Sequence, residues 1–413
     1  MTYTEQQALP TNTFLPYGRQ EISEADIDAV VGALRSDFLT QGPRIEKFET
    51  SLCKAVSARN AVACSNGTAA LHLAMLALDI KPGDEVVTTP NTFVADANCA
   101  RFVGAEVMLC DIDSRTGLMD PNTLEVLLAR DRRKKIKAII PVHFAGQPVD
   151  LERISDLARS HGAYVVDDAC HALGANYQEN GRRQSIGCNH RSDMTVFSFH
   201  PVKHITTGEG GAVTASDPFL ASRLRQFRTH GIIRREFVQD DLACSANGEL
   251  NPWYYEMTEL GFNYRLTDIQ AALGESQLSR LGEIVARRNE IARTYGRLLN
   301  STFDADKVRP LDARADVLHA YHLYVVQIDF QAFSRSRASV MNRLKQRGIG
   351  TQVHYIPINL QPYYRERYQW GPGAFPNAEK YYTRALSLPM YPGLTEQDIE
   401  RVVAELESVL IGG

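Results

Sequence analysis

The sequence predicts an α/β protein whose larger domain is a mostly parallel sheet covered by helices. Short apolar, β-branched runs alternate with helix-period stretches through the first two thirds of the 413 residues. Two of these runs, residues 138–142 and 164–166, are apolar throughout instead of alternating with polar residues. Continuous apolarity indicates burial on both faces, which is typical of parallel strands between helical layers.

Seven strands are expected in this domain, each a short run bounded by loop residues. They cover residues 61–65, 85–89, 106–110, 138–142, 164–167, 194–198 and 212–214. Helices are expected between them, at residues 68–78, 124–130, 151–161 and 219–228. Capping residues mark other helix starts: a variant capping box begins at Ser23, Asp120 precedes a proline, and Thr395 opens the last helix.

The last third of the chain predicts a smaller α+β domain. One long helix is expected from residue 267 to about 299, and it would bridge the two domains. A strand at 321–329, a helix at 338–347, an irregular aromatic segment at 353–370 and two closing helices follow. A chain of 413 residues suits two domains, so we expect a large domain at residues 12–275 and a bridging helix with a small domain at 276–413.

Composition and charge argue against several classes of protein. Lys and Arg number 45 against 49 Asp and Glu, for a net charge of −4, without the basic stripe expected of a nucleic-acid-binding protein. The seven cysteines are scattered and form no CxxC pair, which argues against a disulfide framework or a metal site and for a reducing compartment. No stretch reads as a secretory leader or membrane span, so we expect a cytoplasmic protein without a membrane partner.

One lysine stands out in the segment SFHPVKHITTGEGG, residues 198–211. Lys203 lies in a short loop after an apolar strand, and Thr206, Thr207 and a glycine turn follow it. An amine with hydroxyls and bare backbone amides around it suits a Schiff base to a phosphorylated aldehyde cofactor. Taken alone, the same pattern is more often an exposed loop lysine beside a glycine turn.

A second loop, SNGTAAL at residues 65–71, joins a strand to a helix. Its small residues let a phosphate approach free backbone N–H groups at a helix N-terminus, where the helix dipole also favours an anion. An ordinary helix cap needs the same residue types, so this motif fits both interpretations.

Two further loops follow strands, TPNTF at residues 89–93 and VVDDACH at 165–171. Phe93 can stack on a flat ring, although an aromatic residue at the start of a helix is more often part of the core. Asp167 and Asp168 end a buried strand, and two carboxylates are costly there unless a positive group pairs with at least one of them. A protonated pyridine nitrogen is such a group, and an N-cap pair for the next helix is the alternative.

An open α/β sheet binds its ligands outside the carboxyl ends of its strands, so these four loops are expected to meet at one edge. Lys203 comes one strand after Asp168 in the sequence. A lysine, an acid, a phosphate cradle and a stacking ring at one edge together predict a site for pyridoxal 5′-phosphate.

With these motifs in view, the chain resembles the DegT/StrS-type family of sugar aminotransferases, which have the aspartate-aminotransferase (type I) fold. The resemblance extends over nearly the whole chain. It is carried by LTQGP at 39–43, SNGTAAL at 65–71, DDACHALG at 167–174, SFHPVKHITTGEGG at 198–211 and GFNYRLTDIQAALG at 261–274.

The resemblance implies roles for residues around the cofactor ring. Lys203 would be the catalytic residue, which forms the Schiff base and shuttles protons. Asp168 would pair with the pyridine nitrogen and keep it protonated. Phe93 would stack on the ring, and His171 would contact its phenolic oxygen, a position at which many relatives have glutamine.

The resemblance also implies a phosphate site and a shared dimer. Thr68, the amide of Ala69 and Ser198 would hold the phosphate. Asn263 would reach across from a second subunit, because similar enzymes are homodimers with shared active sites.

Contacts to the sugar nucleotide or to the donor carboxylate are implied for Arg265, His354 and Tyr355. The alternative for each is a purely structural role. The partners implied by the family are a nucleotide sugar and L-glutamate, which leaves as 2-oxoglutarate.

Within the family, the chain resembles the transaminases of pseudaminic acid biosynthesis. The segments that suggest this include DACHALGA, PWYYEMTELGFNYR at 252–265 and VHYIPI at 353–358. Such enzymes aminate C4 of UDP-2-acetamido-2,6-dideoxy-β-L-arabino-hexos-4-ulose. His204 is a departure, since proline is common after the lysine in that subgroup, and residues 234–251 form a longer segment than in some relatives.

Three other functions stay open from the sequence. The strongest is an aminotransferase for another UDP- or dTDP-linked keto sugar, with the keto group at C4 or C3. The second is a sugar dehydratase that uses the same cofactor, although the known deoxygenating branch has histidine in place of the lysine. The third is a non-catalytic ligand sensor, which would need a basic DNA-binding module that this chain has no spare length for.

Overall fold

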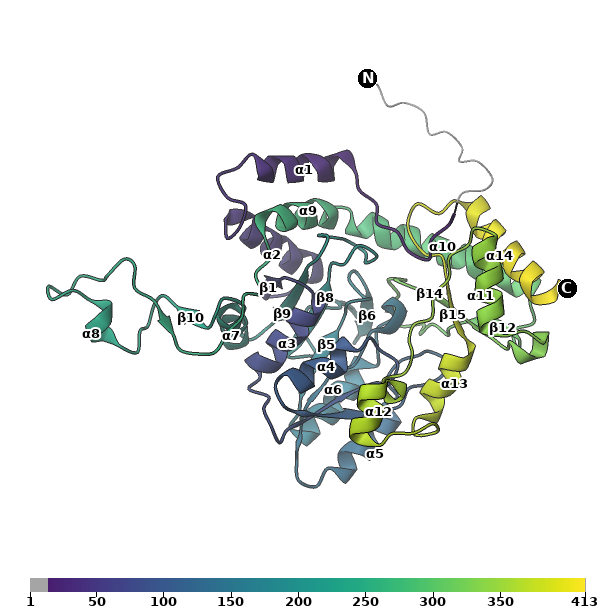
Figure 1. The fold of residues 1–413 in the computed structure, drawn as a ribbon, viewed down its shortest axis with the longest axis horizontal. Helices are drawn as coiled ribbons and strands as arrows, with labels where there is room; N and C mark the ends of the chain where they lie inside the picture. The colour runs from purple at the N-terminus through teal and green to yellow at the C-terminus, as the bar shows by residue number, and fades with distance from the viewer. Residues whose placement is uncertain (1–13, 413) are drawn as a thin grey trace, which may run out of the picture.

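The computed structural model describes residues 14–412. The first residues of the predicted large domain, and the N-terminal segment in which we expect no leader, lie outside the described residues. Figure 1 shows a central sheet wrapped by helices, a smaller unit at the C-terminal end of the chain, and an arm that projects from the body.

The central sheet has seven strands in the order β1-β9-β8-β5-β4-β2-β3. The strands are β1 (Asn60–Cys64), β2 (Glu85–Thr88), β3 (Glu106–Leu109), β4 (Ile136–Ile139), β5 (Tyr164–Asp168), β8 (Met194–Ser198) and β9 (Gly211–Ala215). Neighbouring strands are parallel from β8 to β3, whereas β9 runs antiparallel to both β8 and β1. Each strand overlaps its predicted range, and the predicted mostly parallel sheet is confirmed.

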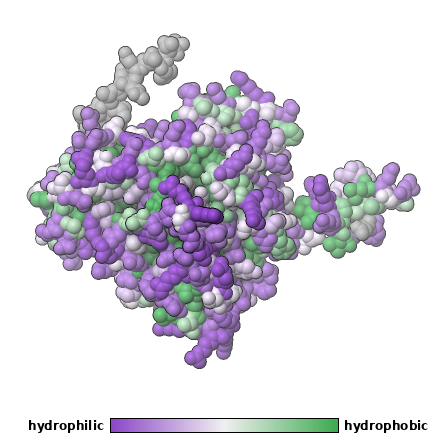
Figure 2. All heavy atoms as spheres, turned by 180° about the vertical axis from the view of Figure 1, so that it is seen from behind, coloured by the Kyte–Doolittle hydropathy of each residue, from purple (hydrophilic) through white to green (hydrophobic). Residues whose placement is uncertain are grey.

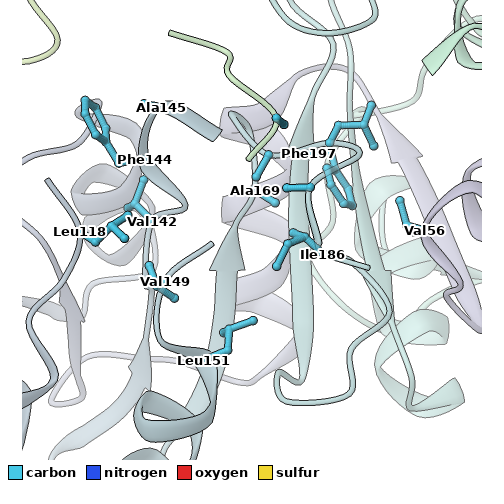
Figure 3. Packing of buried hydrophobic residues seen from close by; sticks show 14 of the residues in the cluster. Val56, Leu118, Val142, Phe144, Ala145, Val149, Leu151, Ala169, Ile186 and Phe197 are labelled. Carbon is cyan, nitrogen blue, oxygen red and sulfur yellow. The ribbon is translucent and has the colours of Figure 1, made fainter. Parts of the chain in front are cut away.

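Helices cover both faces of this sheet (Figure 1). They are α2 (Pro43–Val56), α3 (Gly67–Ala77), α4 (Ala95–Phe102), α5 (Pro121–Arg130), α6 (Leu151–His161) and α7 (Pro218–Arg228). Successive strand residues enter opposite cores: Val196 of β8 packs into one hydrophobic cluster, and Phe197 packs into the other. Figure 3 shows the second of these cores, with Phe197 close to Ala169 and Ile186. This two-sided burial is the reason why the strands are apolar throughout.

The predicted helix starts are present. Ser23 caps α1 (Glu24–Leu34) and Thr395 caps α14 (Glu396–Ile411), both through complete capping boxes. Asp120 caps α5 by accepting a hydrogen bond from the backbone N–H of Asn122. Each cap supplies an acceptor to amides that have no partner inside the helix.

The single long helix expected from residue 267 is two helices, and that prediction was wrong. They are α9 (Asp268–Leu278) and α10 (Leu281–Thr302). At the break, the guanidinium of Arg280 donates to the buried carboxylate of Asp26 at 2.7 Å, which ties the junction to α1. Hydrophobic periodicity does not register such a tertiary contact, so the sequence pattern runs through the break.

The C-terminal unit is α+β, as expected. A three-stranded antiparallel sheet, in the order β12-β14-β15, packs against three helices and α10. These elements are β12 (Val308–Pro310), β14 (Tyr324–Ile328), β15 (Ala385–Leu388), α11 (Arg337–Gln346), α13 (Pro376–Arg384) and α14. Leu15 forms a β-bridge with Ile349 and belongs to this core, so a segment from the N-terminal part of the chain packs within the C-terminal unit. We propose the division at residues 275 and 276, with α9 and α10 joining the two parts.

The aromatic segment 353–370 is not wholly irregular. It contains a short 3₁₀ turn, η3 (Ile358–Leu360), and a helix, α12 (Pro362–Tyr368), which starts at a proline. The other short elements are η1 (Phe144–Gly146), η2 (Gln331–Phe333) and a small sheet of β13 (Val317–Leu318), β6 (Asn176–Glu179) and β7 (Arg182–Ser185).

An arm projects from the body between α7 and α9 (Figures 1 and 2). It contains β10 (Ile232–Ile233), α8 (Asp240–Ala243) and β11 (Glu256–Met257). Large apolar side chains on it lie in the open, among them Val238, Trp253 and Met257, with Trp253 72% exposed. Across residues 14–412, the structure has no helix that is both long and apolar enough to cross a membrane.

Candidate active site

A cavity of about 910 Å³ opens at the carboxyl edge of the parallel strands, and residues of all four predicted loops line it. Thr68, Phe93 and Lys203, which follow three different strands, meet there with Asp168, the last residue of a fourth. Segment 352–356 of the C-terminal unit closes another side. The expectation that these loops share one edge of the sheet agrees with the structure.

Lys203 lies in the loop that joins β8 to its antiparallel neighbour β9. Hydrogen bonds inside the loop hold it: the Lys203 amide donates to His200 O at 2.9 Å, and Thr206 Oγ1 donates to Phe199 O at 3.1 Å. The ammonium group has no hydrogen bond or ion pair with the residues that the structure describes. Burial lowers the pKa of Lys203, although Cys170 and Asp168 oppose the shift. The alternative of an exposed loop lysine is therefore wrong.

Asp168 ends β5 and points into the cavity, and its Oδ1 accepts a hydrogen bond from the Cys170 amide at 2.8 Å. No helix follows it directly, so the alternative of an N-cap pair does not hold. Asp167 is turned away from the cavity, and it accepts from Thr195 Oγ1 at 3.3 Å and faces His143 Nε2 at 3.7 Å. The alternation of side chains along a strand thus separates the two carboxylates.

The N-terminus of α3 lies beside Ser198 at the floor of the cavity. A Cβ added at Gly67 would lie 3.0 Å from Ser198 Cβ, and one added at Gly211 would lie 2.5 Å from the Asn66 backbone. Glycine is thus required for this close approach of β9 to the helix start. The Ala69 amide already donates to the N-cap oxygen, Asn66 Oδ1, at 2.8 Å.

This bond revises the prediction for Ala69, because its N–H is not free as the structure stands. The Gly67 and Thr68 amides occupy the first turn of α3, where no intrahelical acceptor exists, and the Thr68 hydroxyl makes no hydrogen bond with described residues. The predicted anion site therefore has unpartnered donors on Gly67 and Thr68. The third donor, the Ala69 amide, is already bonded to the N-cap residue Asn66, which would compete with an anion for it.

Phe93 is 56% exposed and lines the cavity, so it is not part of the core. The Phe93 ring neighbours that of Tyr355, with centroids 6.1 Å apart, and the Tyr355 hydroxyl is 3.1 Å from His171 Nε2, with the Tyr355 and His171 rings stacked. The second ring nitrogen of His171 is buried without a partner. Burial, followed by the charge of Lys203, lowers the pKa of His171 well below its usual value, so this imidazole is neutral.

Of three residues predicted to contact the substrate or the partner subunit, one lines this cavity and two do not. His354 lines it, but its Nδ1 is engaged with Ser387 Oγ at 2.8 Å, which favours a structural role for that nitrogen. Asn263 and Arg265 do not line the cavity of their own chain. Asn263 is exposed, and Arg265 makes no hydrogen bond or ion pair with described residues.

Sequence reasoning missed several residues of the cavity wall. Tyr17 and His322 line it from segments that carry no motif. Asp96, three residues after Phe93, is a buried carboxylate in the same wall. The signal available for Asp96 was an acidic residue within an otherwise apolar helix start, VADANCA at residues 94–100.

The residues that line the cavity include one lysine and no arginine within the described chain. Three of the lining histidines do not add positive charge, because burial lowers the pKa values of His171, His322 and His354, the last to about 3. No group of side chains suited to holding a metal ion occurs among the described residues. The cavity therefore offers an amine, carboxylates, neutral imidazoles and backbone amides.

The sequence model of the DegT/DnrJ/EryC1/StrS aminotransferase family matches residues 20–407. The chain belongs to this aminotransferase family. The family depends on pyridoxal 5′-phosphate, so this chain is a sugar aminotransferase with that cofactor.

Individual relatives cover almost the whole length of this aminotransferase. The spore coat polysaccharide biosynthesis protein SpsC of Bacillus subtilis (strain 168) is 38% identical over 97% of this chain and 98% of its own. Helicobacter pylori PseC, an aminotransferase involved in the biosynthesis of pseudoaminic acid, is 30% identical, with a TM-score of 0.84 over 96% of this chain and 99% of its own. A proposed sugar aminotransferase of Streptococcus pneumoniae in a PLP form is 27% identical, with a TM-score of 0.82 over 96% and 98% of the two chains.

The residues of this aminotransferase fit the cofactor. The amine of Lys203 is unpaired and its pKa is lowered, as an amine that forms an imine requires. The first turn of α3, whose Gly67 and Thr68 amides have no partner among the described residues, lines the cavity, and such a helix start suits a phosphate. The unpaired ring nitrogen of His171 and the exposed face of Phe93 are further groups that a flat polar ring would satisfy.

Proposed function

We propose that this protein transfers the amino group of L-glutamate to C4 of UDP-2-acetamido-2,6-dideoxy-β-L-arabino-hexos-4-ulose, a step toward pseudaminic acid. The observation that carries the proposal is Lys203, an unpaired amine facing Asp168 across a cavity in the fold that this chain shares with PseC. The segments DACHALGA and VHYIPI line two walls of that cavity and also carry the resemblance to the pseudaminic acid subgroup.

Lys203 is the catalytic residue of this proposal. The bound cofactor would supply an electron sink, and the amine of Lys203 would take a proton from the donor carbon and hold it on Nζ for its return. A base must be neutral to act, and burial lowers the pKa of Lys203 toward that state. After the donor leaves as 2-oxoglutarate, the same amine moves a proton in the opposite direction toward C4 of the sugar.

The remaining walls orient the ring. In this proposal, Asp168 binds the pyridine nitrogen and Phe93 stacks on the ring face. His171 contacts the phenolic oxygen and is itself held by Tyr355. A neutral His171 can donate one hydrogen bond while its other nitrogen accepts from the tyrosine, so both ring nitrogens would be used.

Thr68 and Ser198 bind the phosphate together with the first-turn amides of α3. The Ala69 amide joins them when it leaves Asn66 Oδ1, or shares the bond between the two acceptors. The dipole of the helix adds to the attraction for the phosphate dianion.

We also propose a homodimer in which Asn263 and Arg265 serve the cavity of the partner subunit. Glutamate brings two carboxylates and a UDP-sugar brings a diphosphate, yet no arginine lines the cavity of a single chain in its described part. Arg265 has no hydrogen-bond or ion-pair partner among the described residues and stands at the base of the arm, whose large apolar side chains are exposed in a single chain. A second subunit would supply the guanidinium of its Arg265 to the cavity and would bury the exposed apolar side chains of the arm.

A second candidate is amination of a different keto sugar. It is favoured by the 38% identity to SpsC, a protein of spore coat polysaccharide biosynthesis. Both candidates use the same amine and the same acid, because the choice of sugar depends on a few contacts at the mouth of the cavity.

The test is a substrate panel. Purified protein with pyridoxal 5′-phosphate and L-glutamate is incubated with UDP- and dTDP-linked 4-keto and 3-keto sugars, and the products are identified by NMR. The expected product is UDP-4-amino-4,6-dideoxy-N-acetyl-β-L-altrosamine with one equivalent of 2-oxoglutarate. Amination of another panel member in its place would support the second candidate, and the Lys203→Ala protein is the blank for both.

A further inference from the structure

A second carboxyl group, Asp96, lies in the wall of the cavity next to Asp168. Asp96 is in the first turn of α4, is 1% exposed and lines the cavity. Thr92 Oγ1 donates a hydrogen bond to its Oδ2. Its Oδ1 is buried without any donor among the described residues, and no backbone N–H of the first turn of α4 reaches it.

The neighbour of this carboxyl group is another acceptor. Asp96 and Asp168 both line this cavity, and interaction with Asp168, through its charge and a side-chain hydrogen bond, raises the pKa of Asp96. Two carboxylates in contact inside a buried site cannot both be ionised, because desolvation and like charge both oppose the second negative charge. One proton between them would satisfy Asp96 Oδ1, which otherwise is an unpaired buried acceptor.

The surroundings decide which carboxyl group keeps the proton. Asp168 Oδ1 already accepts a hydrogen bond from the Cys170 amide, whereas Asp96 Oδ1 has no donor among the described residues. Asp96 is more deeply buried, and burial followed by the charge of Asp168 raises its pKa well above the usual value. The Thr92 hydroxyl and the charge of Lys203 act against this shift but are smaller.

We propose that Asp96 is a positioning residue that keeps its proton at neutral pH and donates it in a hydrogen bond to the carboxylate of Asp168. The pair then carries one negative charge, which matches the single positive charge of a protonated pyridine nitrogen. The inference rests on the proposed role of Asp168 toward the cofactor. It adds a second group, besides the Cys170 amide, that fixes the orientation of that carboxylate.

The direct test is infrared spectroscopy of the full-length protein without added cofactor at neutral pH. The wild type should show the carbonyl band of a buried protonated carboxylic acid, and Asp96→Asn should lose it. In Asp168→Asn the band should shift, because the acceptor of its hydrogen bond changes from a carboxylate to an amide. Absence of a band that Asp96→Asn removes, or a band that Asp168→Asn leaves unmoved, would overturn the proposal.

Cofactor binding gives a second readout. Asp96→Ala should weaken binding of pyridoxal 5′-phosphate about tenfold and move the pH midpoint of its absorbance, since a hydrogen bond to a charged group is lost. Asp96→Asn keeps a donor for Asp168 and should hold the affinity within about threefold and the midpoint in place. If the asparagine variant behaves like the alanine variant, Asp96 acts as an ion and the proposal is wrong.

These measurements are separable from the proposed function. The infrared experiment needs neither cofactor nor sugar, so it succeeds or fails whichever keto sugar is aminated. Thr92→Val serves as the structural control: it removes the donor to Asp96 Oδ2 but leaves the proton on Oδ1, so the band should persist.

Discussion

Lys203 and His204 are neighbours in the sequence, but their side chains lie on opposite sides of the loop that carries them. Lys203 lines the cavity, whereas His204 is buried behind the loop with Nε2 3.0 Å from the carbonyl oxygen of Ala320. Burial lowers the pKa of His204 well below its usual value, so the ring is neutral. The departure at residue 204 therefore leaves the amine in the cavity and gives no support to a dehydratase with histidine at that position.

Replacing Lys203 with alanine should abolish turnover, by about 10⁴-fold or more, because the only amine in the described cavity wall is lost. The absorbance of the cofactor bound through Lys203 should also disappear. Single-turnover assays with glutamate and absorbance spectra of the purified variant measure the two effects. Activity equal to the wild type would end the account of the site.

His204→Gln is the matched control for this variant. Gln can donate to the Ala320 carbonyl in place of the ring, and the side chain does not reach the cavity. The absorbance of the bound cofactor should be retained, and unfolding should be easier by about 1 kcal/mol at most. Loss of the absorbance in both variants would mean that the loop, not the amine, is being tested.

Asp168→Asn should leave the fold intact but reduce transamination by about 10²- to 10³-fold. An amide cannot keep the pyridine nitrogen protonated, so the electron sink is weakened. The half-reaction with glutamate, followed by absorbance, measures the loss, and circular dichroism checks the fold. Asp167→Asn is the comparison, since that side chain faces His143 and Thr195 away from the cavity.

Phe93→Ala should weaken cofactor binding by about 3- to 10-fold, which corresponds to the 0.5–1.5 kcal/mol of one aromatic stacking contact. Phe93→Tyr should restore most of it. Phe219 offers a matched control, because it is similarly exposed but lies on α7 outside the main cavity. Dialysis against pyridoxal 5′-phosphate gives the dissociation constants, and equal losses in the Phe93 and Phe219 variants would remove Phe93 from the site.

Mixing two inactive proteins tests the shared active site. Lys203→Ala lacks the amine, and Asn263→Ala lacks the side chain proposed to reach into the partner. A heterodimer has one cavity with both groups intact, so up to about half of the wild-type sites should recover in those heterodimers. Absence of recovery in demonstrated heterodimers would assign Asn263 to a role within its own chain.

The arm gives a separate measure of the dimer. Trp253→Glu places a charge on the most exposed aromatic side chain of the arm, and the proposed dimer should dissociate at a higher protein concentration than that of the wild type. Val126→Glu, on the exposed side of α5, is the control for an added surface charge. Sedimentation velocity over a dilution series distinguishes the two, and equal behaviour would show that the arm is not covered by a second subunit.

The parts of the fold that the sequence predicted are those with a local cause. Continuous apolarity predicted the buried strands, and residue type predicted the helix caps such as Thr395. The four loops could be placed at one edge because parallel strands share a direction. The break at Arg280 and the engagement of Ala69 by Asn66 arise from tertiary or side-chain contacts that periodicity does not register.

Asp96 shows the same limit within the site. Its spacing in the helix marks it only as an acid near a helix start, where a carboxylate is usual. Its contact with Asp168 depends on the separation of α4 and β5 in space, and these elements are far apart in the sequence. Motif residues such as Lys203 and Thr68 could be expected at this cavity from the sequence, whereas the position of Asp96 beside them could not.

The lowered pKa of Lys203 predicts how the reactivity of its amine depends on pH. Burial disfavours the ammonium ion, so Lys203 should become nucleophilic at a lower pH than a solvent-exposed lysine of ordinary pKa 10.5. Lys81 is the internal reference, because it is exposed and its hydrogen bond to Asp79 raises its pKa. Labelling with an amine-reactive aldehyde and borohydride, followed by mass spectrometry across a pH series, should give the earlier midpoint for Lys203.

The carboxylate of Asp168 should also influence the pH at which Lys203 is labelled. Asp168 raises the pKa of Lys203, so Asp168→Asn should move the labelling midpoint of Lys203 to still lower pH and leave that of Lys81 in place. Asp96→Asn should change the midpoint much less, since the proton on Asp96 already removes its charge. A larger shift in the Asp96 variant than in the Asp168 variant would show that the negative charge of the pair resides on Asp96.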